Sequence, residues 1–241
     1  MQFKLFGHLF NVNRLWCFIT LAAFLILIKL SYWQWQRAAE KTEQLQQLAV
    51  LQQQGAISAS QLFNLDSAEA DGVLVEDAGR WLAPYVWLLD NKIVEGRVGY
   101  DVLIPVQFQA TAPALLVNLG WVAAPSSRQS LPEITIPAEI SVSGLVRTKL
   151  GGVLLGQNLE GNTYPMRMQQ VDITALQQQL PVPLYAAVIY QQAPSRFIPH
   201  YKAVVLPPEK HRGYAVQWLG LAIAVLGVAL AASLQLEKKH E

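Results

Sequence analysis

The sequence predicts a membrane protein in which two transmembrane α-helices flank a β-rich (α+β) domain, built as an antiparallel sheet or a small barrel. Two observations support this fold class. The 241-residue chain has two long apolar runs, Trp16–Tyr32 and Tyr214–Leu236. About 20 apolar residues suffice for a helix to cross the hydrocarbon core of a bilayer. Between the runs lie short segments rich in Val, Ile, Leu, Tyr and Trp, which are typical of strands.

The first transmembrane helix is predicted over residues 15–35, after a cytoplasmic tail of residues 1–14. Its one charged side chain, Lys29, lies near an end, where the ammonium group reaches the headgroups. Trp16 and Trp33 suit the two interfaces, because the indole ring is apolar at one end and polar at the other. A cleaved signal peptide is the alternative, and the length of the run and the lack of an Ala-x-Ala site disfavour it.

The second transmembrane helix is predicted over residues 213–236, before a cytoplasmic tail of residues 237–241. It contains no charged residue, and Tyr214 and Trp218 mark its first interface. Basic residues are balanced on the two sides of the membrane, so their number does not decide the orientation. Large domains are translocated largely regardless of such charge, so residues 36–212 are expected to form a domain outside the cytoplasm.

Composition excludes several classes of function. The net charge is +1, which gives no electrostatic reason to expect nucleic acid as a partner. The single cysteine, Cys17, lies inside the first span, so the domain has no thiol for metal binding or disulfide exchange. The sequence also lacks the glycine-rich, Walker, HExxH and GxSxG motifs.

The domain is predicted to begin with a helix over residues 37–54, since this segment is rich in helix formers and free of Gly and Pro until Gly55. A second, short helix is predicted over Val171–Leu180, with Asp172 as its N-cap. Turn residues such as Asp90-Asn91-Lys92 separate the strands, and their hairpin-like spacing favours antiparallel pairing. The predicted strands are Val73–Leu82, Tyr85–Leu89, Val98–Phe108, Ala114–Val122, Glu139–Thr148 and Leu184–Gln191.

The sequence shows little sign of a catalytic site. No two carboxylates have a recognisable acid/base spacing, and Glu76, Asp77, Asp90 and Asp101 are interpreted as solvated strand ends. Of the four histidines, two lie in the terminal tails and His200 follows a proline in a loop. The fourth comes directly before the second span and is the candidate functional residue.

That residue is His211. At 100° per helical residue, His211, Tyr214 and Trp218 lie within about 60° of one another. This face would present an imidazole and two aromatic rings at the membrane interface. The alternative is that His211 is a polar anchor and the rings form an aromatic belt. The opposite face, about 160° away, carries small residues and is expected to pack on another helix, most simply the first span. This packing seam consists of Gly213, Gln217, Gly220, Ala224, Gly227 and Ala231.

The sequence around the two spans resembles a known family. The pattern Trp33-Gln34-x-x-Arg37-x-x-x-Lys41 and the later Lys210-His211-x-x-Tyr214-Ala215-x-Gln217-Trp218 are similar to motifs of the surfeit locus protein 1 family, assembly factors for cytochrome c oxidase. Ser31 stands where the family usually has glycine, which puts a close helix contact at position 31 in doubt. Further matches, in order along the chain, are Gly79-Arg80-Trp81, Leu89-Asp90-Asn91, Gly96-Arg97-Val98-Gly99-Tyr100 with Pro105, and Leu116-Val117-Asn118-x-Gly120-Trp121-Val122.

The resemblance implies a bacterial inner-membrane protein with a periplasmic domain and both termini in the cytoplasm. It implies a role in placing haem a into the catalytic subunit of the oxidase through transient haem binding. Two other partners are expected: membrane lipid, and the enzyme that synthesises haem a. His211 is the residue that the family nominates as ligand of the haem iron. Tyr214 and Trp218 would pack against the macrocycle, and Arg37 would pair with a propionate.

Two other functions remain open. A chaperone of the same pathway would hold the nascent oxidase subunit without ligating haem. A membrane-tethered hydrolase belongs to a different class, and the lack of a nucleophile–base spacing disfavours it. The sequence therefore predicts an assembly factor rather than an enzyme.

Overall fold

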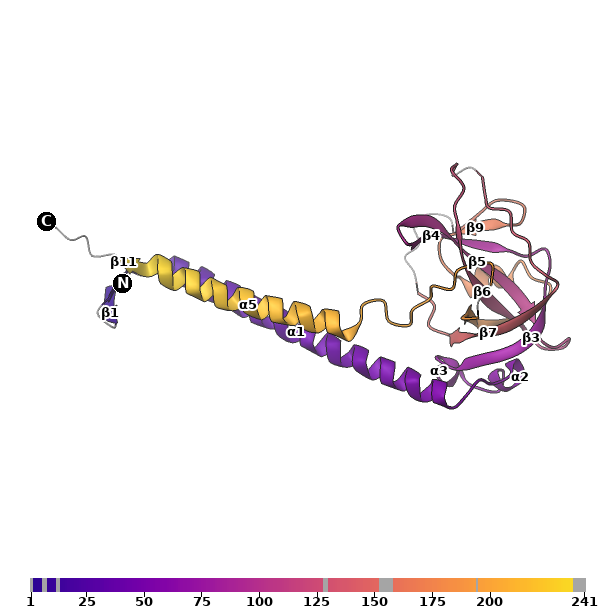
Figure 1. The fold of residues 1–241 in the computed structure, drawn as a ribbon, viewed down its shortest axis with the longest axis horizontal. Coiled ribbons are helices and arrows are strands. Elements are labelled where there is room, and N and C mark those ends of the chain that lie inside the picture. Colours follow the sequence, from indigo (N-terminus) through magenta and orange to yellow (C-terminus); the bar gives the residue numbers. More distant parts are fainter. Residues whose placement is uncertain are drawn as a thin grey trace. The chain divides into compact units, whose positions relative to one another are not determined.

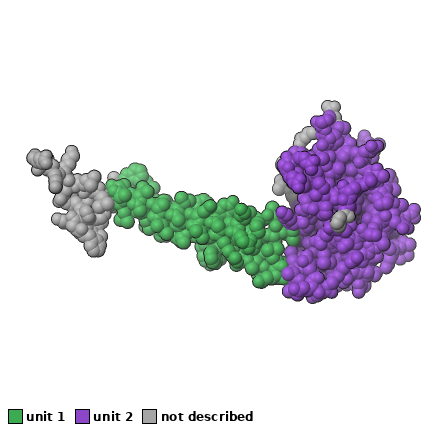
Figure 2. Space-filling view, viewed as in Figure 1, with its two compact units in different colours: residues 1–46, 203–241 green, residues 47–202 purple. Residues whose placement is uncertain are grey.

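The computed structural model describes residues 2–5, 8–11, 14–127, 130–151, 158–193 and 195–235. They belong to two compact units, coloured green and purple in Figure 2. One unit combines Met1–Gln46 with Ala203–Glu241, and the other is Gln47–Lys202. The cytoplasmic tail predicted over residues 237–241 lies outside the described residues.

The first unit is built on two helices, α1 (Arg14–Gln53) and α5 (Pro208–Ser233) (Figure 1). Both contain a stretch long and apolar enough to cross a membrane, with mean hydropathies of 2.0 and 2.1. The protein is therefore a two-span membrane protein. Near the chain ends, a small sheet of β1 (Gln2–Leu5), β2 (His8–Asn11) and β11 (Leu234–Gln235) follows the order β1-β2-β11.

Helix α1 is a single helix of 40 residues that covers both the predicted first span and the helix predicted to follow it. At about 1.5 Å per residue it is ~60 Å long, roughly twice the hydrocarbon thickness of a bilayer. Its second half, from Arg37, is rich in Gln, Glu, Ala and Leu, which favour helix without lipid. This polar half therefore extends beyond the membrane.

The face of α5 that packs on α1 differs from the predicted one. Ala215 and Ala222 are 2% and 0% exposed, whereas Gly213, Gly220 and Gly227 are exposed, and a Cβ added at any of these three would meet nothing within 4 Å. The remaining residues of the predicted seam, Gln217, Ala224 and Ala231, are also exposed. The expectation that this seam packs on the first span is wrong.

Polar contacts explain which face turns inward. The Ser31 Oγ donates a hydrogen bond to the Ala215 carbonyl oxygen, and His211 bonds Gln34, so both contacts draw the opposite face of α5 toward α1. At membrane depth a polar side chain is stabilised when it hydrogen-bonds another part of the protein. An exposed glycine costs little there, because its backbone groups are already hydrogen-bonded within the helix. The polar side chains therefore decide the orientation, not the small ones.

This arrangement makes a testable prediction for two neighbouring residues. We expect Ala222→Leu to force the helices apart and destabilise the protein by about 1–3 kcal/mol, the usual range for overpacking. Gly220→Leu, which places the same side chain on the open face, should be tolerated. The measurement is the yield and melting temperature of the full chain in detergent. Equal losses from both variants would show that this face of α5 does not pack.

The second unit contains a closed barrel of five strands, namely β3 (Leu74–Trp81), β7 (Glu139–Arg147), β10 (Leu184–Gln191), β6 (Ala114–Ala123) and β5 (Arg97–Gln107) (Figure 1). The barrel closes because β3 also pairs with β5, through Arg80 with Gln107 and Trp81 with Val106. Beyond β5 the sheet continues through β4 (Trp87–Val94), β9 (Met166–Met168) and β8 (Leu159–Glu160). Of the two predicted architectures, the small barrel is confirmed.

Strands β5 and β6 are buried on both faces, so they belong to two hydrophobic clusters. Val102 and Ile104 point into the barrel with Val117, while Leu103 and Leu116 pack on the other side. That outer cluster is completed by Trp87, Met168 and α4 (Ile173–Gln177). The N-cap predicted for α4 is confirmed, because the Asp172 side chain accepts a hydrogen bond from the Ala175 N–H at 3.1 Å. Helix α4 is nevertheless shorter than predicted.

Three local features differ from the sequence-based expectations. The turn predicted at Asp90-Asn91-Lys92 lies inside β4, where Asn91 has a φ of 59° and the pairing with β5 shifts register. A bulge absorbs the turn residue without ending the strand. Pairing is not wholly antiparallel, since β10 is parallel to β6 and β9 to β4. Two short helices that were not predicted, α2 (Ala59–Leu62) and α3 (Ser67–Ala70), both begin with a capping box.

Candidate functional site

The strongest candidate in the membrane unit is the contact between His211 and Gln34. His211 lies in the first turn of α5 and is 8% exposed. Its Nδ1 is 2.7 Å from the Oε1 of Gln34 on α1. An amide oxygen can only accept a hydrogen bond, so Nδ1 carries the hydrogen and donates it. In the neutral ring Nε2 then keeps a lone pair, which is the form that binds a metal.

Two further contacts fix α5 on α1 around this histidine. The Ser31 Oγ lies 2.8 Å from the Ala215 carbonyl oxygen, and the Arg212 Nη2 lies 3.5 Å from the Thr42 Oγ1. The serine in place of glycine puts a close helix contact at position 31 in doubt, but α1 and α5 do meet there, because the serine hydroxyl itself makes the contact. The imidazole is thus held between two flanking contacts along the helix pair.

The other predicted binding residues lie on the same two helices, α1 and α5. Tyr214 is 44% exposed and Trp218 is partly buried. Arg37 is half exposed, pairs with Glu40 at 2.7 Å and lies with its guanidinium carbon 5.7 Å from the centroid of the Trp33 ring. Among the described residues, no hydrogen bond or ring contact joins these side chains to His211.

The face of α5 that carries His211 was expected to point away from the partner helix, and this expectation is wrong. His211, Ala215 and Ala222 share the buried face of α5. Arg37 nevertheless lies one turn from Gln34, and residues three apart on a helix have Cβ atoms roughly 5–6 Å apart. The structure thus brings together His211 and Gln34 directly, with Arg37 on the neighbouring turn of α1.

A second polar cluster lies in the barrel, around Asp101 of β5. Its carboxylate is 4% exposed, with Oδ1 at 2.5 Å from the His200 Nε2 and Oδ2 accepting a hydrogen bond from the Asn118 Nδ2 at 3.0 Å. The interpretation of Asp101 as a solvated strand end is therefore wrong. A charge inside the apolar run Val98–Val106 was the signal that could have indicated a buried, partnered carboxylate.

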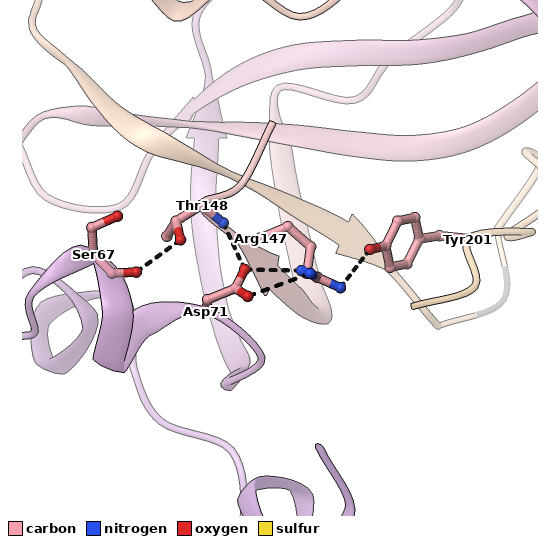
Figure 3. Close-up of polar contacts among 5 residues, drawn as sticks. All are labelled: Ser67, Asp71, Arg147, Thr148 and Tyr201. Carbon is pink, nitrogen blue, oxygen red and sulfur yellow. Dashed lines mark hydrogen bonds and ion pairs between the residues drawn. The ribbon is translucent and has the colours of Figure 1, made fainter. Parts of the chain in front are cut away.

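Close to it, Arg147 lies between Asp71 and Tyr201, as Figure 3 shows. The Arg147 Nε is 2.9 Å from the Asp71 Oδ1, and its Nη1 donates to the Tyr201 hydroxyl at 2.8 Å. Tyr201 also stacks on Tyr190, with ring centroids 3.8 Å apart. Burial raises the pKa of Tyr190, and its neighbour Tyr201 raises it further. The Tyr190 hydroxyl therefore stays protonated at neutral pH.

These contacts fasten the chain segment that follows β10 onto the barrel. Ile198 pairs with Trp121 through two backbone hydrogen bonds of 2.8 and 2.9 Å. His200 contacts Asp101, and Tyr201 accepts a hydrogen bond from Arg147. The hollow beside them, lined in part by Asn118, Tyr190 and His200, is open to solvent and has about 0 Å³ of interior space that could hold a water molecule. Pockets for drug-sized ligands are far larger, so this hollow does not suit a macrocycle.

The Asp101–His200 pair in the barrel and the His211–Gln34 pair in the membrane unit differ in the chemistry they can perform. Asp101 and His200 have the geometry of a carboxylate–imidazole base, but within the described ranges no serine, threonine or cysteine hydrogen-bonds His200. The same ranges hold no group of three or more His, Cys, Asp or Glu able to bind a metal ion. Haem iron needs only an axial ligand from the protein, since the porphyrin supplies four nitrogens. The donor set at His211 fits that requirement.

Sequence reasoning found His211 but missed its partner. Gln34 is a polar side chain at the end of an apolar run, and such residues in transmembrane helices commonly hydrogen-bond a neighbouring helix. The partner on the other helix lies 177 residues away, so no local pattern identifies it.

Comparison with protein families identifies a match. The model of the SURF1 family matches residues 21–223, a range that begins inside α1, includes the whole barrel and ends inside α5. A search of curated proteins finds no match.

Proposed function

Because this chain belongs to the SURF1 family, which is known for cytochrome oxidase assembly, we propose that it assists the insertion of haem a into the catalytic subunit of cytochrome c oxidase. In this proposal the protein binds the haem transiently at the helix pair and passes it to the subunit. The family is one of assembly factors, not one known for enzymes. Interaction with oxidase subunits follows from that role.

The geometry of His211 is the observation that carries the haem proposal. Its Nδ1 is engaged by Gln34, which leaves Nε2 as the nitrogen available to iron. Haem has an apolar ring and charged propionates, so a ligand near the end of a transmembrane helix suits it. Bound haem would supply the iron and the macrocycle, and the protein would supply the ligand and the surrounding side chains.

The residues around His211 have defined roles in this proposal. Arg37 would hold a propionate through its planar guanidinium, which suits bidentate pairing. Its present partner, Glu40, is half exposed, so exchanging it costs little. Tyr214 and Trp218 would offer their rings to the macrocycle. An exposed tyrosine and a partly buried tryptophan at this level leave apolar surface for that contact.

The test compares three proteins purified from cells that make haem a: wild type, His211→Ala and His211→Asn. An asparagine places an amide N–H near the position of Nδ1, so His211→Asn keeps a donor for Gln34 but has no Nε2. We expect both variants to lose most of the bound haem and the Soret band. Unchanged haem-to-protein ratios and spectra in both variants would refute the ligand role.

A second candidate function is a chaperone that holds the nascent oxidase subunit without ligating haem. The burial of His211 against α1 and its bond to Gln34 favour this alternative, because they account for the histidine as an anchor between helices. The same variants distinguish the two functions. If His211 is only an anchor, His211→Ala lowers the melting temperature, His211→Asn largely restores it, and neither changes the haem content.

The orientation in the membrane is part of the proposal. We place the barrel domain in the periplasm of a bacterial cell and both termini in the cytoplasm, since large domains are translocated largely regardless of flanking charge. Alkaline phosphatase fused after Gln109, in the exposed loop between β5 and β6, should be active. The same enzyme fused after Glu241 should be inactive. The reverse pattern would overturn the orientation.

A further inference from the structure

Gln34 is the one described side chain that hydrogen-bonds His211, and the contact joins two segments 177 residues apart. The bond is 2.7 Å long, and its acceptor is a neutral amide oxygen rather than a carboxylate. A histidine that binds a metal almost always donates its second ring N–H to a carboxylate, a backbone carbonyl or a water, which fixes both the tautomer and the ring orientation. The amide oxygen of Gln34 is chemically like a backbone carbonyl oxygen.

We propose that Gln34 is a positioning residue for haem binding, which holds His211 in the Nδ1–H form and directs the Nε2 lone pair to the iron. This inference rests on the proposed function. It adds a role for Gln34 that is separate from simple attachment of the two helices. The role is specific to the acceptor oxygen, because only an acceptor keeps the hydrogen on Nδ1.

The surroundings of the pair support this role. His211 is 8% exposed, so water does not readily replace the glutamine as acceptor. The contacts of Ser31 with Ala215 and of Arg212 with Thr42 hold α5 in place on either side of the histidine. They join the helices without Gln34, so a substitution at position 34 can alter the imidazole and leave the helix pair assembled.

The neutral character of Gln34 also has a consequence for the iron. A carboxylate acceptor draws the Nδ1 hydrogen more strongly and makes Nε2 a stronger donor, whereas an alkyl side chain releases the ring. A stronger donor stabilises ferric over ferrous iron. The reduction potential of bound haem is therefore expected to report the identity of residue 34.

The experiment uses the full chain with haem a, as wild type, Gln34→Glu, Gln34→Leu and Gln36→Leu. Gln36 lies two residues away and is exposed. Among the described residues its side chain hydrogen-bonds only the Tyr32 hydroxyl, at 3.1 Å, so its variant is the matched control. Haem-to-protein ratio, reduction potential and the iron–histidine stretching frequency in resonance Raman spectra are measured. None of these is a measure of oxidase assembly.

We expect Gln34→Leu to weaken haem binding by about 10–100-fold, the usual effect of removing the partner of a ligating histidine. Gln34→Glu should retain haem, lower its reduction potential and raise the iron–histidine frequency. Gln36→Leu should match wild type in all three measurements. This pattern would establish the positioning role.

Two other results have distinct meanings. If His211→Asn abolishes haem binding while both Gln34 variants match wild type in potential and frequency, the positioning role is wrong and the proposed function stands. If His211→Asn leaves haem binding unchanged, the proposed function fails and the inference fails with it. A loss of fold in Gln34→Leu alone leaves Gln34→Glu, which keeps an acceptor, to decide the question by its potential.

Discussion

Gly99→Ala is expected to destabilise the barrel by about 3 kcal/mol or more, at the upper end of the usual cost of overpacking. A Cβ at this position of β5 would lie 2.1 Å from the Val122 carbonyl oxygen and 2.5 Å from atoms of the Trp121 ring. Neither neighbour can yield easily. Val122 contributes backbone of the paired strand β6, and Trp121 is 2% exposed and held by a hydrogen bond from its Nε1 to the Lys92 carbonyl oxygen at 3.1 Å.

The measurement is the melting temperature of the full chain in detergent, with unfolding monitored by near-ultraviolet circular dichroism. Gly151→Ala is the control, because a Cβ there would meet nothing within 4 Å and the backbone needs no positive φ. This control should melt with wild type. A Gly99→Ala protein that melts within a degree of wild type would show that β5 and β6 do not approach as closely as described.

Asp71→Asn is expected to cost about 2 kcal/mol, between the ~0–1 kcal/mol of exposed ion pairs and the ~3–5 kcal/mol of breaking a fully buried one. The Asp71 and Arg147 side chains are 15% and 18% exposed, so water partly screens the pair (Figure 3). The asparagine keeps an oxygen for the Thr148 N–H but leaves the guanidinium without a counter-charge. Arg147 also binds Tyr201, so the loss extends to the segment after β10.

The effect of Asp71→Asn should depend on pH. Burial by itself raises the pKa of Asp71, but the hydrogen bond from the Thr148 N–H and the Arg147 guanidinium outweigh it and lower the pKa overall. A lowered pKa in the folded state stabilises the protein above the ordinary aspartate value of about 4. That contribution is lost as the pH falls through the folded-state value. The difference in stability between wild type and variant should therefore be constant near neutral pH and shrink below about pH 4.

Urea unfolding at several pH values, with the protein in detergent, measures this difference. Glu160→Gln serves as the control, because Glu160 pairs with Arg167 at 3.1 Å but is 48% exposed. It should change the stability by less than about 1 kcal/mol. An Asp71→Asn protein no less stable than the Glu160→Gln protein at pH 7 would contradict the assigned importance of the Asp71–Arg147 pair.

The sequence by itself determined the elements whose stability is local. The two apolar runs identified α1 and α5, because crossing a membrane depends on the length and composition of one segment. The six predicted strands correspond to β3, β4, β5, β6, β7 and β10, since alternation and turn residues act over a few positions. Asp172 was identified as a cap for the same reason, as its bond to Ala175 spans three residues.

Part of the candidate site was also within reach of the sequence. The position of His211 before the second span, near two aromatic residues, is a property of about two helical turns. Its neighbours on α5 follow from helical periodicity, and the predicted separation of the two faces is correct as geometry. Periodicity does not say which face meets a partner, and the choice of face was wrong.

The tertiary structure decided everything that depends on distant partners. Ser31 and Gln34 of α1 turn the histidine face of α5 inward through contacts 184 and 177 residues apart in sequence. The pairing of β3 with β5 closes the barrel, and Asp101 meets His200 across 99 residues. In each case the energy of a buried polar group depends on a partner that no neighbouring residue specifies. Local patterns therefore identified the helices, the strands and the histidine, while non-local hydrogen bonds determined how they are combined.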